Sequence, residues 1–149
     1  MNRSVVVLNG PNLNLLGRRN PEVYGTATLA DVEKLCLEEA APLGLDVDLF
    51  QSNHEGALID RIHQAFADGA AVVCNLGAYT HTSIAIMDAL AVLTTPVVEV
   101  HLSNIHAREE FRHRSYVALV ADASIVGAGV HGYALALRPV AHLLDTASS

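Results

Sequence analysis

Short apolar runs alternate with longer helical patterns along the whole chain, and this alternation restricts the fold more than any other feature. The run SVVVL at residues 4–8 is continuous and β-branched, which is typical of a strand buried on both faces. Parallel strands need a long crossover connection, and a helical pattern follows almost every run. The predicted strands cover residues 4–8, 45–51, 70–76, 96–102 and 124–129, and the predicted helices cover residues 28–44, 55–69, 81–93 and 130–144.

This order of elements predicts an α/β fold: a doubly wound, five-stranded parallel sheet with helices on both faces and a flavodoxin-like strand order. Thr28 is placed to cap the first long helix, and Gly44 to end it. Pro139 is expected to bend or restart the last helix. The length of 149 residues, with no linker or repeat, indicates one domain over residues 1–149.

Composition narrows the classes of partner. The net charge is −7 and Lys34 is the single lysine, which argues against a nucleic-acid binder because such proteins neutralise phosphates with basic patches. No apolar run reaches the roughly 18 residues that span a bilayer, and the first residues lack a signal-peptide pattern. We therefore expect a cytoplasmic protein with no membrane partner, in which Cys36 and Cys74 are reduced and buried.

Polar segments follow the predicted strands at their carboxyl ends, where ligands bind in folds of this kind. Glu99 and His101 are two residues apart in a predicted strand, so both side chains project from one face. A carboxylate beside an imidazole is the usual arrangement of a histidine acid–base, although a structural ion pair would look the same. Ser103 and the neighbouring amides offer donors for a carboxylate.

The segment NLGAYTHTS, residues 75–83, ends a predicted strand and begins a helix. A helix N-terminus with hydroxyls and His81 could receive an oxyanion or a polyol. Alternatively, Thr80 and Thr82 only cap the helix and His81 is a surface residue. Asp88 would lie about 10 Å further along the helix, so it either meets a neighbouring subunit or is a solvated residue.

Arg108 and Arg112 are four residues apart and would share a face if their segment were helical. They could bind an anion, or they could belong to a solvated charged face that Glu109 and Glu110 partly neutralise. The histidines, cysteines and carboxylates show no convincing metal-ligand spacing, so no metal site is predicted.

The first predicted strand leads into LNGPNLNLLGRRNPEVYG, which ends at Gly25 and shows no clear secondary structure. A phenol is a weak base at neutral pH, and a nearby guanidinium favours its ionised form. Arg18 or Arg19 could supply such a guanidinium to Tyr24. Glycines at 17 and 25 could act as hinges of a lid that closes over a site. The alternative is a flexible surface loop.

Four stretches, LNGPNLNLLGRRNPEVYG, QSNHEG, YTHTSIAIMDAL and EVHLSNIHAREEFRHRSY, closely resemble type II 3-dehydroquinate dehydratase of the shikimate pathway. The resemblance implies a flavodoxin-like subunit, a homododecamer built as a tetramer of trimers, and no cofactor. It implies anti elimination of water from 3-dehydroquinate through an enolate. In that reaction Tyr24 removes the proton next to the ketone, Arg19 supports the tyrosinate, and Asn12 holds a water that stabilises the enolate. His101, oriented by Glu99, protonates the departing hydroxyl.

The same resemblance assigns the groups that bind substrate. Asp88 would reach the site of the next subunit, and Arg108 would lie near the base. Leu76 and Gly77 depart from the family pattern, where a small residue or proline and an alanine are more usual. The remaining binding groups that it implies are Asn75, His81, the Leu102 amide, Ser103 and Arg112.

Other functions fit the sequence less well. Dehydration through a lysine Schiff base lacks a candidate, because Lys34 lies within a predicted helix away from the strand ends. A receiver-type signalling module would need an acidic cluster after the first strand, and a nucleotide binder would need a glycine-rich phosphate loop. A catalytically inactive member of the fold is disfavoured because Tyr24, Arg19 and His101 are all present.

Overall fold

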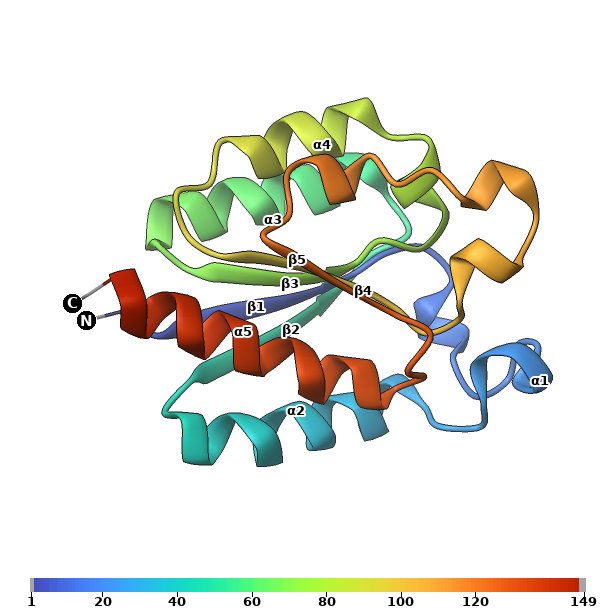
Figure 1. Ribbon diagram of the computed structural model, residues 1–149, viewed down its shortest axis with the longest axis horizontal. Coiled ribbons are helices and arrows are strands. Elements are labelled where there is room, and N and C mark those ends of the chain that lie inside the picture. The colour runs from blue at the N-terminus through green and yellow to red at the C-terminus, as the bar shows by residue number, and fades with distance from the viewer. Residues whose placement is uncertain (1, 148–149) are drawn as a thin grey trace.

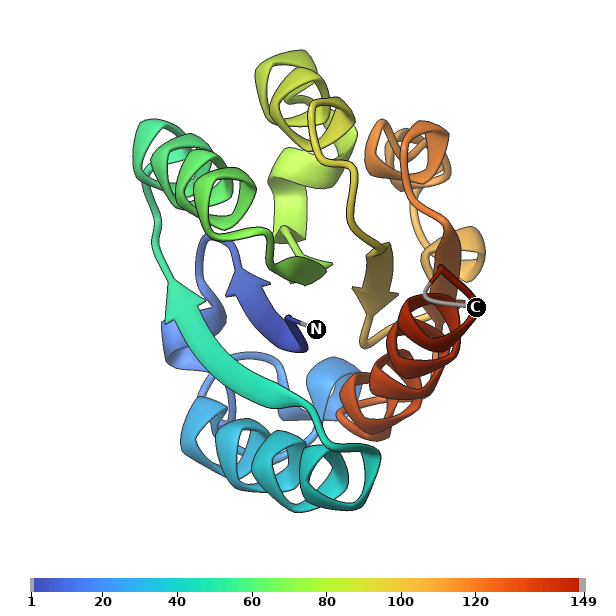
Figure 2. The ribbon, with the colours of Figure 1, turned by 90° about the vertical axis from the view of Figure 1, so that its left-hand side faces the viewer.

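The computed structural model describes residues 2–147. Its centre is a five-stranded, all-parallel sheet in the order β2-β1-β3-β4-β5, which is the flavodoxin-like order that the sequence predicts. Buried β-branched residues are common in β1, β3 and β4, as expected of strands covered on both faces. Helices lie on both sides of the sheet (Figures 1 and 2). The strands are β1 Ser4–Asn9, β2 Asp46–Gln51, β3 Ala71–Asn75, β4 Val97–His101 and β5 Ala123–Val126.

Helices cover the sheet in two layers (Figure 1). One core cluster joins one face of the sheet to α2 and α5, with Val32 and Leu137 fully buried. A second cluster joins the other face to α3 and α4, with Leu58 and Ile86 fully buried. The helices are α1 Pro21–Tyr24, α2 Leu29–Leu43, α3 Glu55–Asp68, α4 Ile84–Ala91 and α5 His131–Ala147.

The predicted ends of α2 are confirmed. Thr28 forms a capping box with Asp31, and Gly44 ends the helix in the left-handed conformation. The predicted restart of the last helix is wrong, because α5 continues through Pro139 to Ala147.

Other details of the predicted elements also need correction. The last strand ends at Val126, not at residue 129. The helix expected at residues 81–93 is the shorter α4, which the Ser83 side chain caps, and a 3-10 turn at Gly77–His81 precedes it. The stretch after β1, in which no secondary structure was predicted, contains a 3-10 turn at Leu13–Leu15 and the short helix α1.

Cys36 and Cys74 are free and buried, as predicted. Within residues 2–147, no helix is both long and apolar enough to cross a membrane.

Candidate active site

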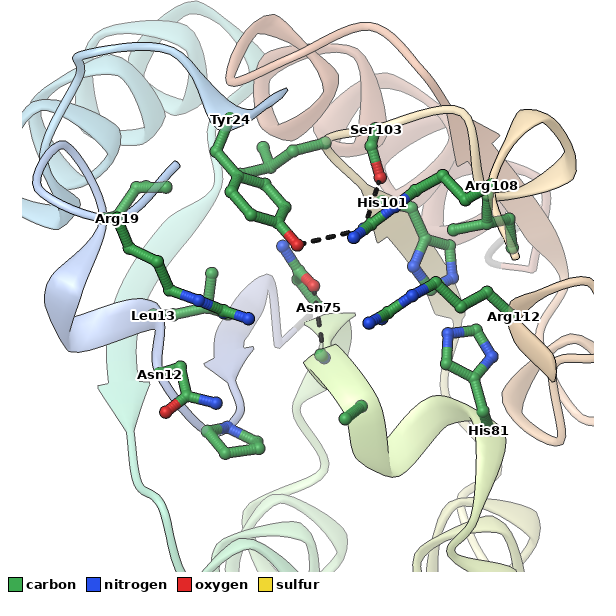
Figure 3. A pocket seen from close by; sticks show the side chains of 16 residues that line it. Asn12, Leu13, Arg19, Tyr24, Asn75, His81, His101, Ser103, Arg108 and Arg112 are labelled. Carbon is green, nitrogen blue, oxygen red and sulfur yellow. Dashed lines mark hydrogen bonds between the residues drawn. The ribbon is translucent and has the colours of Figure 1, made fainter. Parts of the chain in front are cut away.

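A cavity lined by 16 residues opens at the carboxyl edge of the sheet (Figure 3). Its walls come from the loop after β1, the 3-10 turn after β3 and the segment after β4. Ten of the twelve residues predicted for the site line it. These are Asn12, Arg19, Tyr24, Asn75, His81, His101, Leu102, Ser103, Arg108 and Arg112.

The two remaining predicted residues lie elsewhere. Glu99 lies behind His101, below the cavity, and is 2% exposed. Asp88 is exposed on α4 and does not line the cavity of its own chain. The prediction that one chain cannot bring Asp88 and His81 to the same small ligand therefore agrees with the structure.

The Glu99–His101 pair is confirmed at the end of β4. His101 Nε2 donates to Glu99 Oε2 at 2.8 Å, so the carboxylate fixes the tautomer of a ring that is 5% exposed. The hydroxyl of Ser124 on β5 donates to Glu99 Oε1 at 2.7 Å, and Ser115 Oγ donates to Oε2. Burial alone would raise the pKa of Glu99, but the hydrogen bonds from the imidazole and the two hydroxyls outweigh it and hold that pKa below its usual value. The carboxylate is therefore anionic at neutral pH.

Tyr24 enters the cavity between two guanidinium groups. It is the last residue of α1, which begins at Pro21 in the position that proline favours. Arg108 Nη1 donates to the Tyr24 hydroxyl at 3.0 Å and to Ser103 Oγ at 3.2 Å. The Cζ atoms of Arg19 and Arg108 each lie 5.4 Å from the centroid of the tyrosine ring. Both guanidinium groups thus lie against the tyrosine side chain in the cavity (Figure 3).

Arg108 and Arg112 reach the cavity without sharing a helix. Arg108 is extended between a 3-10 turn at Ile105–Ala107 and another at Glu110–Arg112, so the two arginines do not share the face that a helical segment would have given them. Arg112 Nε lies 3.3 Å from both carboxylate oxygens of Glu109, which holds its guanidinium at the cavity wall.

His81 lies at the end of its 3-10 turn, not at the helix N-terminus that the sequence indicated. Its Nδ1 is 2.7 Å from the carbonyl oxygen of Arg114, and its ring stacks on His101 with centroids 6.2 Å apart. Burial lowers the pKa of His81, aided by His101 and Arg112. A neutral His81 with its proton on Nδ1 presents an acceptor at Nε2.

The backbone of the loop after β1 packs closely against the turn after β3. Gly10 N donates to the Asn75 carbonyl at 2.8 Å, and a Cβ at Gly10 would lie 2.4 Å from the Leu76 oxygen. Gly77 has a φ of +57°, a backbone conformation that favours glycine. Leu76 is 1% exposed and fills the core below the turn.

Sequence reasoning missed three polar residues that support the site. The spacing of Ser115 and Ser124 from Glu99 carries no pattern, so neither could be found. Tyr133 on α5 did carry a signal, since a tyrosine in an apolar helical pattern needs a hydrogen-bond partner when buried. Its hydroxyl donates to Asn9 Oδ1 at 2.6 Å and accepts from Asn75 Nδ2 at 3.0 Å.

The arrangement suits an anionic small molecule that undergoes proton transfer. Three arginine side chains line the cavity, while the nearest buried carboxylate is engaged by its own donors. Phenol and imidazole groups can both transfer protons, and the cavity holds a phenol flanked by cations and an imidazole held by a carboxylate. Within residues 2–147, no three or more histidine, cysteine, aspartate or glutamate side chains cluster as a metal site would require.

The chain is similar to known proteins over most of its length. The family model described as dehydroquinase class II matches residues 3–141. A 3-dehydroquinate dehydratase from Methylobacterium radiotolerans is 60% identical over 143 residues, with 96% of each chain covered. One from Streptomyces avermitilis is 59% identical over 146 residues, covering 97% of this chain and 92% of that protein.

A solved structure from the same family is also similar to this chain. The crystal structure of type II dehydroquinase from Propionibacterium acnes superposes with a TM-score of 0.91 at 48% identity, covering 95% of this chain and 98% of the other. A family match over most of the chain, relatives of about 60% identity and the same fold lead to one conclusion. This chain belongs to the class II dehydroquinase family.

Proposed function

We propose that this chain is a type II 3-dehydroquinate dehydratase, a hydro-lyase that converts 3-dehydroquinate to 3-dehydroshikimate and water. The observation that carries the proposal is the placement of Tyr24, between two guanidinium groups, in one cavity with His101, whose ring is bonded from behind by Glu99. The whole chain is one catalytic domain, and its own side chains supply both proton transfers without a cofactor.

Tyr24 is the base. Its phenolate takes the proton from the carbon next to the substrate ketone, and the electron pair of that bond moves onto the ketone oxygen as an enolate. Arg19 and Arg108 stabilise the phenolate before this step because both face the ring. Asn12, at the cavity wall, holds the water that donates to the enolate oxygen.

His101 is the acid. When the enolate collapses, the bond from carbon to the departing hydroxyl breaks on the opposite side, and the imidazolium gives that hydroxyl a proton to form water. Glu99 stabilises the charged ring at 2.8 Å, and its low pKa keeps it anionic while His101 gains and loses its proton.

The remaining cavity residues hold the substrate's carboxylate and hydroxyls. Neutral His81 accepts from a hydroxyl, and the guanidinium of Arg112 donates to one. The carboxylate is bound by the Leu102 amide, Ser103 and Asn75, since hydroxyls, amides and backbone N–H groups are suitable donors.

A route through a lysine imine has no candidate. Lys34 lies on the surface of α2, with a side chain that is 80% exposed and 4.0 Å from Glu38. It does not line the cavity. The enolate route, which needs a base and electrostatic stabilisation, uses groups that do line it.

The proposal extends to assembly and location. Asp88 reaches the cavity of a neighbouring subunit in a homododecamer built as a tetramer of trimers, and the protein acts in the cytoplasm. The exposure of Asp88 on α4, away from its own cavity, supports a role between subunits.

The experiment follows ultraviolet absorption of the conjugated product after mixing pure protein with 3-dehydroquinate, without added metal or cofactor. Tyr24→Phe should lower kcat by about 10²–10⁴-fold, the range typical of removing a general base. Tyr116→Phe is the matched control, because its ring lies beside Arg114 outside the cavity lining. No product from folded wild-type protein would reject the proposed reaction, and wild-type rates in Tyr24→Phe would reject the assigned base.

A further inference from the structure

A buried polar network lies directly beneath the cavity. Tyr133 on α5 is 0% exposed and packs in the core cluster between α2, α5 and the sheet. Its hydroxyl bridges two strands: it donates to Asn9 Oδ1 at 2.6 Å and accepts from Asn75 Nδ2 at 3.0 Å. Burial raises the pKa of Tyr133 above its usual value, so the hydroxyl keeps the proton that it donates.

The sheet brings the two asparagines to this hydroxyl. Asn9 ends β1 and Asn75 ends β3, and their Cα atoms are partners in the parallel register. Side by side in adjacent strands, their side chains share the face that α5 covers. Asn9 Nδ2 donates to carbonyl oxygens at 3.4 and 3.5 Å, and both bonds are longer than the 2.6 Å bond that Asn9 Oδ1 accepts from Tyr133. The tyrosine hydroxyl is therefore the closest partner that orients the Asn9 amide.

The network also fixes which way the Asn75 amide faces. Asn75 Oδ1 accepts from Gly77 N at 3.3 Å, and one Nδ2–H is directed to Tyr133. A flipped amide would place NH₂ against the Gly77 N–H. It would also place an oxygen against a hydroxyl whose proton is engaged by Asn9. The observed orientation leaves one N–H of Asn75 free of these bonds, and Asn75 lines the cavity.

We propose that Tyr133 is a positioning residue: it holds the Asn75 amide so that its remaining N–H donates to an oxygen of the bound substrate. This inference rests on the proposed function, in which Asn75 binds 3-dehydroquinate. Tyr133 itself does not touch the cavity, so its effect on catalysis passes through Asn75.

The test is a double-mutant cycle with Tyr133→Phe and Asn75→Ala. Tyr133→Phe keeps the ring and removes only the hydroxyl, and it should raise KM and lower kcat/KM about tenfold, equivalent to about 1.4 kcal/mol, as for one hydrogen bond. In the Asn75→Ala background, the same change should lower kcat/KM less than about twofold, because the group it acts through is gone.

Leu137→Val is the matched control for lost packing, since Leu137 lies on the same helix and in the same core cluster. Kinetics are normalised to the folded fraction, measured by near-ultraviolet circular dichroism. An equal loss of kcat/KM in both backgrounds, or a loss no larger than in Leu137→Val, would overturn the positioning role.

A crystal structure of Tyr133→Phe gives a readout independent of activity. We expect the Asn75 side chain to leave the position in which it contacts Gly77 N. An unmoved Asn75 side chain would refute the inference even if activity fell. If wild-type protein shows no dehydratase activity, the proposed function fails, while this structure still decides whether the hydroxyl holds Asn75.

Discussion

Replacing Glu99 by glutamine tests whether the buried carboxylate stabilises the fold as an anion. In the wild-type protein it accepts hydrogen bonds from His101 Nε2 at 2.8 Å, from Ser124 Oγ at 2.7 Å, and from Ser115 Oγ. Glutamine preserves the shape but offers one acceptor atom, and the Ser124 hydroxyl can reverse to accept from its NH₂. The two bonds at the other oxygen lose their charged acceptor.

The expected magnitude follows from these two bonds. A hydrogen bond to a charged group contributes about 1.5–3 kcal/mol, against about 0.5–1.5 kcal/mol for a neutral pair. Weakening two of them lowers the free energy of unfolding by about 2 kcal/mol at pH 7. For a chain of this length, the midpoint of thermal unfolding should fall by about 4–8 °C.

The difference in stability between wild type and Glu99→Gln depends on pH in a defined direction. The pKa of Glu99 in the folded protein is below the ordinary value of 4.5. Its ionised form therefore stabilises the fold above about pH 4.5, and that contribution is lost as pH falls through the lower, folded-state pKa. The gap between wild type and Glu99→Gln should be widest at neutral pH and shrink in acid.

Thermal unfolding followed by circular dichroism at pH 7 and at about pH 3.5 measures both the fall in midpoint and its decrease in acid. Glu38→Gln is the control, because its side chain is 63% exposed and its nearest cation is 4.0 Å away, so its midpoint should match the wild type. Equal midpoints for wild type and Glu99→Gln at pH 7 would refute the reasoning, as would a gap that widens in acid.

Two further substitutions test the cavity walls. Arg19→Ala should lower kcat about 10²–10³-fold with little change in unfolding midpoint, because Arg19 is exposed and faces the base. Its exposed neighbour Arg18 does not line the cavity, so a similar kinetic loss in Arg18→Ala would contradict this assignment. Gly10→Ala should destabilise the fold by about 1–3 kcal/mol, measured by urea unfolding, because its Cβ would lie 2.4 Å from the Leu76 oxygen. The helical Gly56 has open space around it, so Gly56→Ala should be neutral or stabilising, and equal destabilisation by both would count against the steric argument.

The sequence predicted most of the fold because each strand and helix carries its own periodic pattern. The two-residue spacing of Glu99 and His101 placed them on one face, and the structure confirms their contact. The sequence also predicted that residues near the strand ends would line a site, because parallel strands bring their carboxyl ends to one edge of the sheet.

What the sequence could not predict depends on contacts between distant segments. The segment around Arg108 shows a charge spacing that suits a helix, but the chain forms two 3-10 turns. Arg108 meets Tyr24 across 84 positions of sequence, and Tyr133 meets Asn9 across 124. No local pattern encodes such pairs, whereas tertiary packing decides them.

The pairing of Asn9 with Asn75 has a consequence for folding fidelity. If β1 slipped by one residue against β3, Leu8 or Gly10 would stand opposite Asn75, and the side chains of β1 would change faces. The Tyr133 hydroxyl would then be buried without Asn9 as acceptor, at a cost of about 1–3 kcal/mol for the unsatisfied group. In a core built from aliphatic residues alone, such a slip would leave no buried polar group unsatisfied, so it would lack this cost. The hydrogen bonds that join Asn9, Asn75 and Tyr133 beneath the cavity therefore also favour the correct alignment of the two central strands.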